Sequence, residues 1–266
     1  MITTIEIATF EEVLKLMTEQ EYDENIQRHR ASCLYRGIPN VEYHLQTSLQ
    51  RNCKGKQGRV EKSILRNFTK YAAIEDSELQ KSIWRQLIIG QHHGLPTRLL
   101  DWTYSPLIGL HFATSGEDLK SMDEHDCILW KIDINELNSM LPEKYKTVLQ
   151  DEKAYLYTVD MLMKVVDDLD KYDSDMSDSA MLLLEPPSID QRIINQYSYF
   201  SIVPNMVEDI EAFFDTRTSN TVKYIIRKEL RWKIRDVLDQ MNINERIIFP
   251  GLDGISTWIK RHYYVK

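Results

Sequence analysis

Polar side chains gather in one short stretch of the chain, between two segments that are rich in apolar residues. The stretch reads Gln91-His-His-Gly-Leu-Pro-Thr-Arg-Leu-Leu-Asp-Trp-Thr103. Polar groups that are crowded between apolar elements must satisfy one another or bind a ligand. We therefore take Asp101 as a candidate catalytic residue, although an ion pair with Arg36 or Arg98 is an equally simple role for it. The candidate ligand-binding residues of this stretch are His92, His93, Thr97, Arg98, Trp102 and Thr103.

An arginine near the N-terminus is the second candidate. Arg36 lies in the run Cys33-Leu-Tyr-Arg-Gly37, which predicts a short strand. Alternation along a strand places Leu34 and Arg36 on the same face. A guanidinium beside a core leucine is costly unless it meets a carboxylate, a phosphate or several carbonyl groups. Arg36 is thus either one half of a structural ion pair or a two-pronged clamp on an anionic ligand, with Tyr35 as a neighbouring ligand-binding candidate.

A third polar group comes late in the chain. Ser188 and Gln191 have the spacing of a helix capping box, and Arg192 and Gln196 lie one turn apart on the helix that it predicts. Glu185 precedes this helix. A simple capped helix explains the same pattern. We keep Arg192 as a candidate ligand-binding residue, and Glu185 and Gln196 as candidate catalytic residues.

Several kinds of chemistry lack their sequence signatures. The chain has no GxSxG elbow, no HExxH pair, no Walker-type GxxxxGK[ST] loop and no GxGxxG fingerprint. Cys33, Cys53 and Cys127 form no CxxC pair, which disfavours a zinc site or a disulfide framework and fits a reducing compartment. The acidic stretch 167–178 lacks the glycine and the final glutamate of a calcium loop. We therefore expect no metal site, and a solvated loop over the acidic stretch.

The remaining sequence predicts a mixture of helices and strands. Helices are expected over 10–20, 59–74, 77–93, 105–113, 154–169, 229–241 and 251–263. In the first of them the predicted apolar stripe consists of Phe10, Val13, Leu14 and Met17. Strands are expected over 33–37, 128–132, 181–184, 199–203 and 222–226. Because these elements show no regular βαβ alternation, we predict an α+β fold with a mixed sheet core and several flanking helices.

Composition sets broad limits on the function. A length of 266 residues suits one large domain, and an apolar content of 42% argues against wholesale disorder. The net charge of −8 argues against a surface that coats nucleic acid. One run is nevertheless locally basic, and it consists of Arg51, Lys54, Lys56, Arg59 and Lys62. We see neither a secretory leader pattern nor an apolar run of membrane-spanning length, so we expect a cytoplasmic protein with no membrane partner.

These motifs resemble the FRG domain family, which is named for a Phe-Arg-Gly near its start. Here Tyr35 replaces the phenylalanine, and Arg36 and Gly37 are kept. In this chain the run from His93 to Thr103, together with Ser105-Pro106 and Phe112-Ala113, is similar to the hallmark motif of the family. The Arg192…Gln196…Phe200 spacing and the ending Ile248-Phe-Pro-Gly-Leu-Asp-Gly254 are also similar. The resemblance implies one FRG-like domain over 30–266, after an N-terminal helical segment over 1–29.

The FRG resemblance leaves the activity open; the family occurs in bacterial and phage genomes, often beside mobile or defence elements. A more distant likeness is to ADP-ribosyltransferases, and it implies a divergent version of their fold. In those enzymes a first-strand arginine or histidine anchors NAD. A Ser/Thr-rich strand then runs into a helix with an Ala-x-x-Phe pattern, and a late strand supplies Glu or Gln. The same order is followed here by Arg36, then 100–103 with 110–113, then Gln196 or Glu185, although no Glu-x-Glu pair is present.

Three functions remain open on this basis. The first is an enzyme that cleaves NAD, as its substrate, and transfers ADP-ribose to a protein, a nucleic acid or water through an oxocarbenium-like state. Its expected parts are a pyrophosphate clamp (Arg36, with Arg98), an aromatic surface (Trp102 or Tyr35) and a carboxylate or amide beside the ribose (Glu185, Asp190 or Gln196). The second is a catalytically inactive module that binds a nucleotide or phosphorylated ligand in the same pocket. The third is a nucleic-acid-directed toxin or nuclease.

Overall fold

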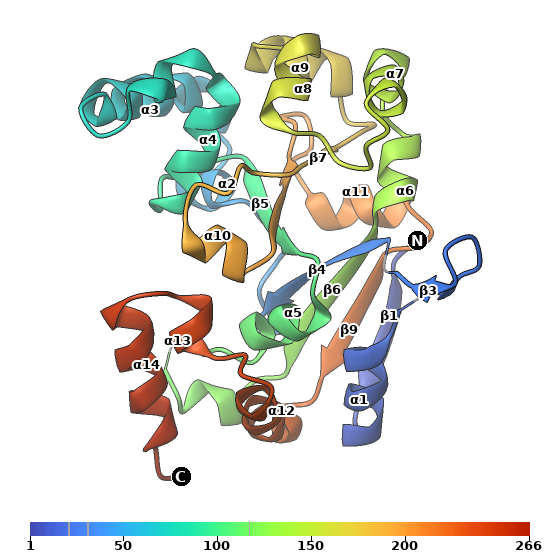
Figure 1. Ribbon diagram of the computed structural model, residues 1–266, viewed down its shortest axis with the longest axis vertical. Coiled ribbons are helices and arrows are strands. Elements are labelled where there is room, and N and C mark those ends of the chain that lie inside the picture. Colours follow the sequence, from blue (N-terminus) through green and yellow to red (C-terminus); the bar gives the residue numbers. More distant parts are fainter. Residues whose placement is uncertain (21, 31, 117) are drawn as a thin grey trace.

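A mixed seven-stranded sheet forms the centre of the molecule (Figure 1). The computed structural model describes residues 1–20, 22–30, 32–116 and 118–266. The sheet order is β1-β9-β6-β4-β5-β8-β7. Its strands are β1 (Thr3–Ile7), β4 (Cys33–Ile38), β5 (Leu99–Thr103), β6 (Cys127–Asp133), β7 (Leu182–Leu184), β8 (Ser198–Ile202) and β9 (Val222–Ile226). The predicted α+β class, with a mixed sheet and flanking helices, is confirmed.

The N-terminal segment contributes to this same sheet. Strand β1, which the sequence analysis did not predict, pairs in parallel with β9, so that Thr3 lies opposite Val222. The predicted first helix follows as α1 (Phe10–Thr18), and a short ribbon of β2 (Tyr22–Asp23) and β3 (Arg28–His29) comes next. The segment 1–29 is therefore more than a helix, because its first strand is hydrogen-bonded to the far end of the chain.

The sheet is weakly joined at its middle. Strands β4 and β5 pair at one register position, with Tyr35 opposite Thr103. By contrast, β4 pairs with β6 along its whole length, and β5 does the same with β8. Buried backbone groups need hydrogen-bond partners, so the groups that lie beyond this single junction must find them elsewhere.

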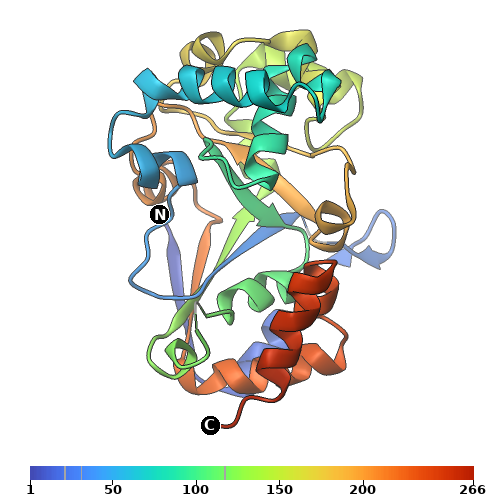
Figure 2. The same ribbon diagram turned by 90° about the vertical axis from the view of Figure 1, so that its left-hand side faces the viewer.

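Helices cover both faces and both ends of the sheet (Figures 1 and 2). Near the start of the chain these are α2 (Ser48–Cys53), α3 (Gln57–Ala72), α4 (Ile83–His92) and α5 (Pro106–Ala113). The middle of the chain forms α6 (Ile134–Ser139), α7 (Glu143–Asp151), α8 (Val159–Val165), α9 (Leu169–Met176) and α10 (Gln191–Asn195). The last four are α11 (Ile210–Arg217), α12 (Lys228–Gln240), α13 (Glu245–Ile248) and α14 (Leu252–His262). Short 3₁₀ turns lie at Ser77–Lys81 and Ser121–Asp123.

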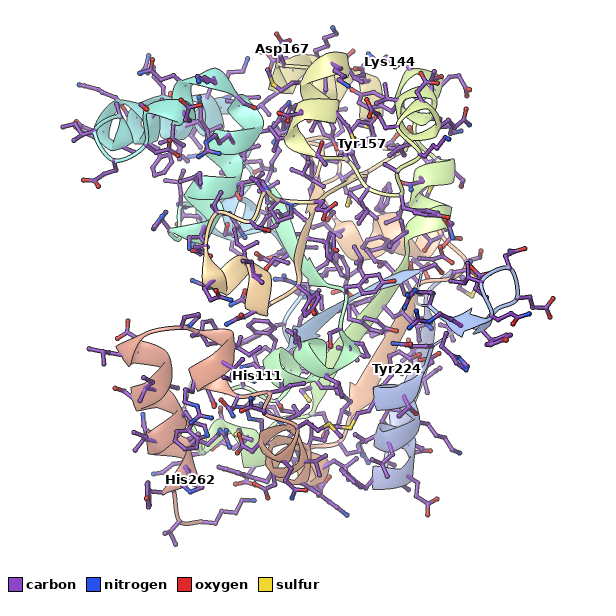
Figure 3. All side chains as sticks on the ribbon, in the orientation of Figure 1. His111, Lys144, Tyr157, Asp167, Tyr224 and His262 are labelled. Carbon is purple, nitrogen blue, oxygen red and sulfur yellow. The ribbon has the colours of Figure 1, made fainter. Side chains whose placement is uncertain are left out.

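Buried apolar side chains hold these layers together. Figure 3 shows them filling the space between helices and sheet, with Tyr157 in the upper cluster and Tyr224 in the lower one. A third cluster, which includes Trp102 and Trp130, lies on the face of the sheet that α11 covers. Each fully buried side chain of this size contributes about 1.5–3 kcal/mol by leaving water. No helix in the described part of the chain is long and apolar enough to cross a membrane.

Helix α5 lies directly on the backbone of β4. The sequence predicted its start correctly, because Ser105 accepts a hydrogen bond from the backbone N–H of Ile108 and Pro106 is the first helical residue. A Cβ atom on Gly37 would lie 2.1 Å from the carbonyl oxygen of Gly109. Glycine at position 37 is therefore what lets the helix and the strand approach so closely.

Three helical predictions need correction. The helix predicted over 77–93 is a 3₁₀ turn over Ser77–Lys81 followed by α4, because Ser82 between them is extended and caps α4. In α1 the residue Leu14 is exposed, and Leu16 takes the buried place beside Val13 and Met17. The helix predicted over 154–169 begins only at Val159, because Tyr157 forms a β-bridge with Leu184. The buried face of α1 and the start of α8 were each decided by a contact with a distant element. The local periodicity of the sequence does not reveal such contacts.

The acidic stretch is a helix rather than a loop. Helix α9 begins after Asp168, whose carboxylate accepts hydrogen bonds from the backbone N–H groups of Asp170 and Lys171. Its apolar residues Leu169, Tyr172 and Met176 are all buried. These three side chains share one face of the helix and anchor it. Its acidic side chains cap the helix or form ion pairs with basic side chains.

Candidate functional site

A pocket of about 250 Å³ opens beside the junction of β4 and β5. Larger hollows of about 460 and 530 Å³ lie on outer helices, away from the motif residues. The walls of the pocket come from β4, β5, α4, α5, α10, the segment that joins α10 to β8, and the first residue of β8. They consist of Tyr35, Arg36, Gly37, Gln91, Asp101, Trp102, Thr103, Phe112, Arg192, Gln196 and Ser198. Arg36 and Asp101 thus line the same pocket, as the sequence suggested.

The guanidinium of Arg36 bridges the gap between the two central strands. Its Nη1 atom donates to the backbone carbonyl oxygen of Asp101 at 2.7 Å and lies 3.4 Å from the Oδ2 atom of the same residue. Its Nε atom is buried and has no hydrogen-bond partner among the described residues. Burial lowers the pKa of Arg36, and the nearby Asp101 carboxylate opposes that shift. A guanidinium that is 20% exposed and lines a pocket favours an anionic ligand at this place.

A short chain of hydrogen bonds orients the Asp101 carboxylate. The buried hydroxyl of Thr97 accepts from the backbone N–H of Leu99 and donates to the Oε1 atom of Gln91 at 2.6 Å. The amide of Gln91 is thereby turned so that its Nε2 atom donates to Oδ2 of Asp101 at 2.8 Å. The side chain of Asp101 remains 53% exposed. Of the described residues that line the pocket, Asp101 is the one carboxylate, and its Oδ1 atom is left for a ligand.

His92 links α4 to α10 and does not line the pocket. Its Nε2 atom contacts the carboxylate of Asp190. Asp190 is also the N-cap of α10, where it accepts from the backbone N–H of Ile193 at 2.9 Å, so the predicted cap at Ser188 was wrong. Burial lowers the pKa of His92, against the effect of Asp190. His93 is exposed and packs edge-on against the ring of His92.

The part of the pocket wall that Arg192 and Gln196 form is supported by the end of α13 and the residue after it. The side chain of Gln196 donates to the backbone carbonyl of Ile248 at 3.2 Å. The guanidinium carbon of Arg192 lies 5.2 Å from the centre of the Phe249 ring, at the distance of a cation–π contact. Arg192 and Gln196 both line the pocket, although α10 ends at Asn195 and does not include Gln196. Their roles in ligand binding and catalysis stay predictions.

Five of the predicted site residues do not line the pocket: His92, His93, Thr97, Arg98 and Glu185. The guanidinium of Arg98 is buried between carboxylates, with Nε 2.8 Å from Glu61 and Nη1 2.6 Å from Asp173. Its donors are engaged there, so it is not available to clamp a ligand beside Arg36. Glu185 is exposed at the end of β7 and does not line the pocket.

The aromatic residues proposed from the sequence are core residues. The indole of Trp102 is 2% exposed, and its Nε1 atom donates to the hydroxyl of Ser201 at 3.0 Å. Tyr35 is equally buried, as is Thr103, whose hydroxyl accepts from the backbone N–H of Ser105. Phe112 of α5 is partly exposed and lines the pocket, so it is the aromatic side chain that a ligand can reach.

Three pocket residues were not singled out from the sequence. Gln91 begins the polar stretch, and its position one residue before two histidines could have indicated a role. Phe112 was noted only as part of the family pattern. Ser198 reaches the pocket because it lies opposite Thr103 in the sheet, and that pairing is not visible in either local sequence.

The electrostatics of the pocket favour an anion over a metal ion. Its lining holds the cations Arg36 and Arg192 against the single carboxylate of Asp101. A further cation, Arg51, is close enough to act on the charge of Arg36. Within the described residues, no group of three or more His, Cys, Asp or Glu side chains is arranged to hold a metal ion. The planar guanidinium of arginine, with its fork of N–H donors, is typical of phosphate and carboxylate recognition.

Comparison with known proteins supports the resemblance to the FRG family. The family model of the FRG domain matches residues 31–122. This segment supplies the pocket walls from β4, α4, β5 and α5, including Arg36 and Asp101. The walls that contain Arg192 and Gln196 lie outside it. Searches of the curated proteins and of the solved structures returned no match.

Proposed function

We propose that the pocket binds the pyrophosphate of NAD and that the protein is an ADP-ribosyltransferase-like, NAD-cleaving enzyme. One observation carries the proposal: Arg36, Asp101 and Gln196 line a single pocket. They come from β4, from β5 before the apolar helix α5, and from the C-cap of α10, two residues before β8 begins. In ADP-ribosyltransferases the anchoring arginine, the polar strand and the late Glu or Gln follow the same order along the chain.

Arg36 is the pyrophosphate clamp in this proposal. Both of its contacts with Asp101 use Nη1, which leaves Nη2 to donate to a phosphate oxygen, while Nε is buried and out of a ligand's reach. Arg192 supplies a second positive charge in the same lining. Two cations beside one carboxylate suit a ligand with two negative phosphates.

In this proposal Asp101 is the carboxylate that acts beside the ribose. In NAD cleavage the bond between the ribose C1′ and the nicotinamide nitrogen breaks, and its electron pair leaves with nicotinamide. Positive charge then develops on the ribose, and a nearby carboxylate stabilises it. The acceptor hydroxyl attacks C1′ and gives its proton to Asp101. Gln196 would hold a ribose hydroxyl, and Phe112 would pack against the nicotinamide ring.

A binding module without catalysis is the second candidate. Two donors, from Gln91 and Arg36, already contact Oδ2 of Asp101, and this arrangement would also suit a carboxylate that only orients a ligand. A nucleic-acid-directed role has weaker support, because Lys62 of the basic run is paired with Asp170. The occurrence of FRG proteins beside defence elements makes bacterial or phage defence, in the cytoplasm, the setting that we propose.

The test combines ligand binding and nicotinamide release. We expect purified protein to bind ADP-ribose in calorimetry and to release nicotinamide from NAD. Arg36→Ala should weaken binding by about 2–5 kcal/mol, which is roughly thirty- to several-thousand-fold. Arg36→Lys should fail almost as badly, because lysine lacks the planar pair of donors. Asp101→Asn should keep binding but reduce nicotinamide release by about 100-fold or more.

Arg85 provides the matched control. It is a partly buried arginine that pairs with Asp76 at 2.9 Å, away from the pocket. Arg85→Lys should leave ADP-ribose affinity unchanged. Wild-type protein that shows no heat with NAD or ADP-ribose would refute the proposal, whereas binding without nicotinamide release would favour the module.

A further inference from the structure

Helix α14 carries an apolar stripe on its outer side. The stripe consists of Leu252, Ile255, Ile259 and Tyr263, and these side chains are between 37% and 81% exposed. Their spacing places them on one face of the helix. Figure 1 shows α14 at the left-hand edge of the lower part of the molecule, in Figure 2 the same helix faces the viewer, and Figure 3 labels His262 at its end. A continuous exposed apolar face of this kind marks an interaction surface.

The opposite face of α14 fixes the helix firmly. A Cβ atom on Gly254 would lie 1.8 Å from the carbonyl oxygen of Phe249, so the helix touches the preceding segment there. Buried Arg261 binds Asp239 of α12 with both terminal nitrogens, at 2.8 and 2.7 Å. It also binds Glu245 of α13, with Nε at 2.8 Å. The stripe is therefore presented by an anchored helix and cannot turn inward to bury itself.

The sequence of α14 is complementary to itself in the antiparallel direction. When two such helices pair about a two-fold axis near Thr257, Ile255 of one copy faces Ile259 of the other. Leu252 then faces Tyr263. The flanking charges match in the same register, because Asp253 of one copy lies opposite Lys260 of the other. Apolar residues thus meet apolar residues and each acid meets a base, as an isologous interface requires.

We propose that α14 is the surface through which two copies of this chain form a two-fold symmetric dimer. The helix has eleven residues and is about 16 Å long. An interface made of one such helix from each copy lies at the low end of specific interfaces. We therefore expect the dimer to be weak and reversible. This inference is independent of what the pocket binds.

The experiment measures oligomeric state against concentration. We expect sedimentation equilibrium of the full chain to show dimers that increase from low micromolar to several hundred micromolar protein. Asp253→Lys alone should weaken the dimer by about tenfold, because it sets like charges opposite each other twice. Lys260→Asp alone should do the same. The double variant reverses both charges and should restore the wild-type dimer.

Two further variants complete the test. Ile259→Glu should abolish the dimer, since it sets a charge in the middle of the stripe. Ile74→Glu is the control, because Ile74 is an exposed isoleucine on another part of the surface and its change should leave the dimer intact. Melting curves confirm that each variant folds. Wild-type protein that stays monomeric throughout, or a dimer that neither Ile259→Glu nor the single charge changes affect, would overturn the proposal.

Discussion

The buried ion group around Arg98 allows a quantitative test of its structural role. Arg98 and Glu61 are each 2% exposed, and Nε of the arginine donates to Oε1 of Glu61 at 2.8 Å. A second contact joins Nη2 to the other carboxylate oxygen. Replacing Glu61 with glutamine keeps the shape but removes the charge. It also turns an amide N–H₂ group toward the guanidinium, so that donors face donors.

The expected cost follows from burial. Breaking a buried pair by changing one partner typically costs about 3–5 kcal/mol. Asp173 still accepts from Nη1 of Arg98 at 2.6 Å, so we expect the lower end, about 3 kcal/mol. For a chain of this length that corresponds to a fall in Tm of about 6–12 °C. The adjacent Lys62 is the control, because it pairs with Asp170 where both side chains are more than half exposed. Lys62→Gln should cost less than about 1 kcal/mol.

Urea unfolding followed by circular dichroism gives the free energy of unfolding of the three proteins, and calorimetry gives their affinity for ADP-ribose. Folded Glu61→Gln protein should bind as the wild type does, because Arg98 lies outside the pocket. If Glu61→Gln lowers the free energy of unfolding by less than about 1 kcal/mol, the ion group of Arg98, Glu61 and Asp173 does not hold α3, β5 and α9 together. Lost binding in a variant that remains folded would return Arg98 to the site.

Two further predictions concern stability. Trp102→Ala should destabilise the protein by about 3–5 kcal/mol in urea unfolding, because the indole is core; an unchanged free energy of unfolding would mean that the ring lies in an open site. Burial raises the pKa of Glu245, but hydrogen bonds from Arg261 and the charge of Arg235 outweigh it and lower that pKa to about 2. The resulting stabilisation, about 3 kcal/mol, is complete above the unfolded pKa of about 4.3 and is lost as pH falls toward 2. Wild-type protein should therefore lose more stability than Glu245→Gln between these pH values in urea unfolding, and parallel losses would contradict the assignment.

Local sequence predicted the elements whose signals are local. The sequence signals lie within a few residues for three such elements: the strand around Arg36, the strand over 222–226, and the start of α5 at Ser105-Pro106. Strand β1 was missed because the partner that stabilises it, β9, lies at the other end of the chain. The acidic helix α9 was missed because its charges outnumber the three apolar residues that fix it.

The same distinction separates the two candidate clamps. Arg36 and Arg98 were both expected to hold the pyrophosphate of a ligand. The partners of Arg98, Glu61 and Asp173, are distant from it in sequence, so no local pattern connects them. Arg36 and Asp101 are also far apart, but each stood out as a polar residue within an apolar run. Their shared pocket could be predicted, whereas the inward turn of Trp102 depended on packing against Phe214.

The single junction between β4 and β5 bears on how this chain can be divided. The FRG match over residues 31–122 contains both strands but neither of the neighbours with which each is fully paired, β6 and β8. Excised at those limits, the segment would keep one β-register contact and expose two long unpaired strand edges, which are prone to aggregate. The matched segment is therefore a signature of one side of the pocket, not a module that can be moved to another protein. Any transplant of this site has to carry the sheet with it.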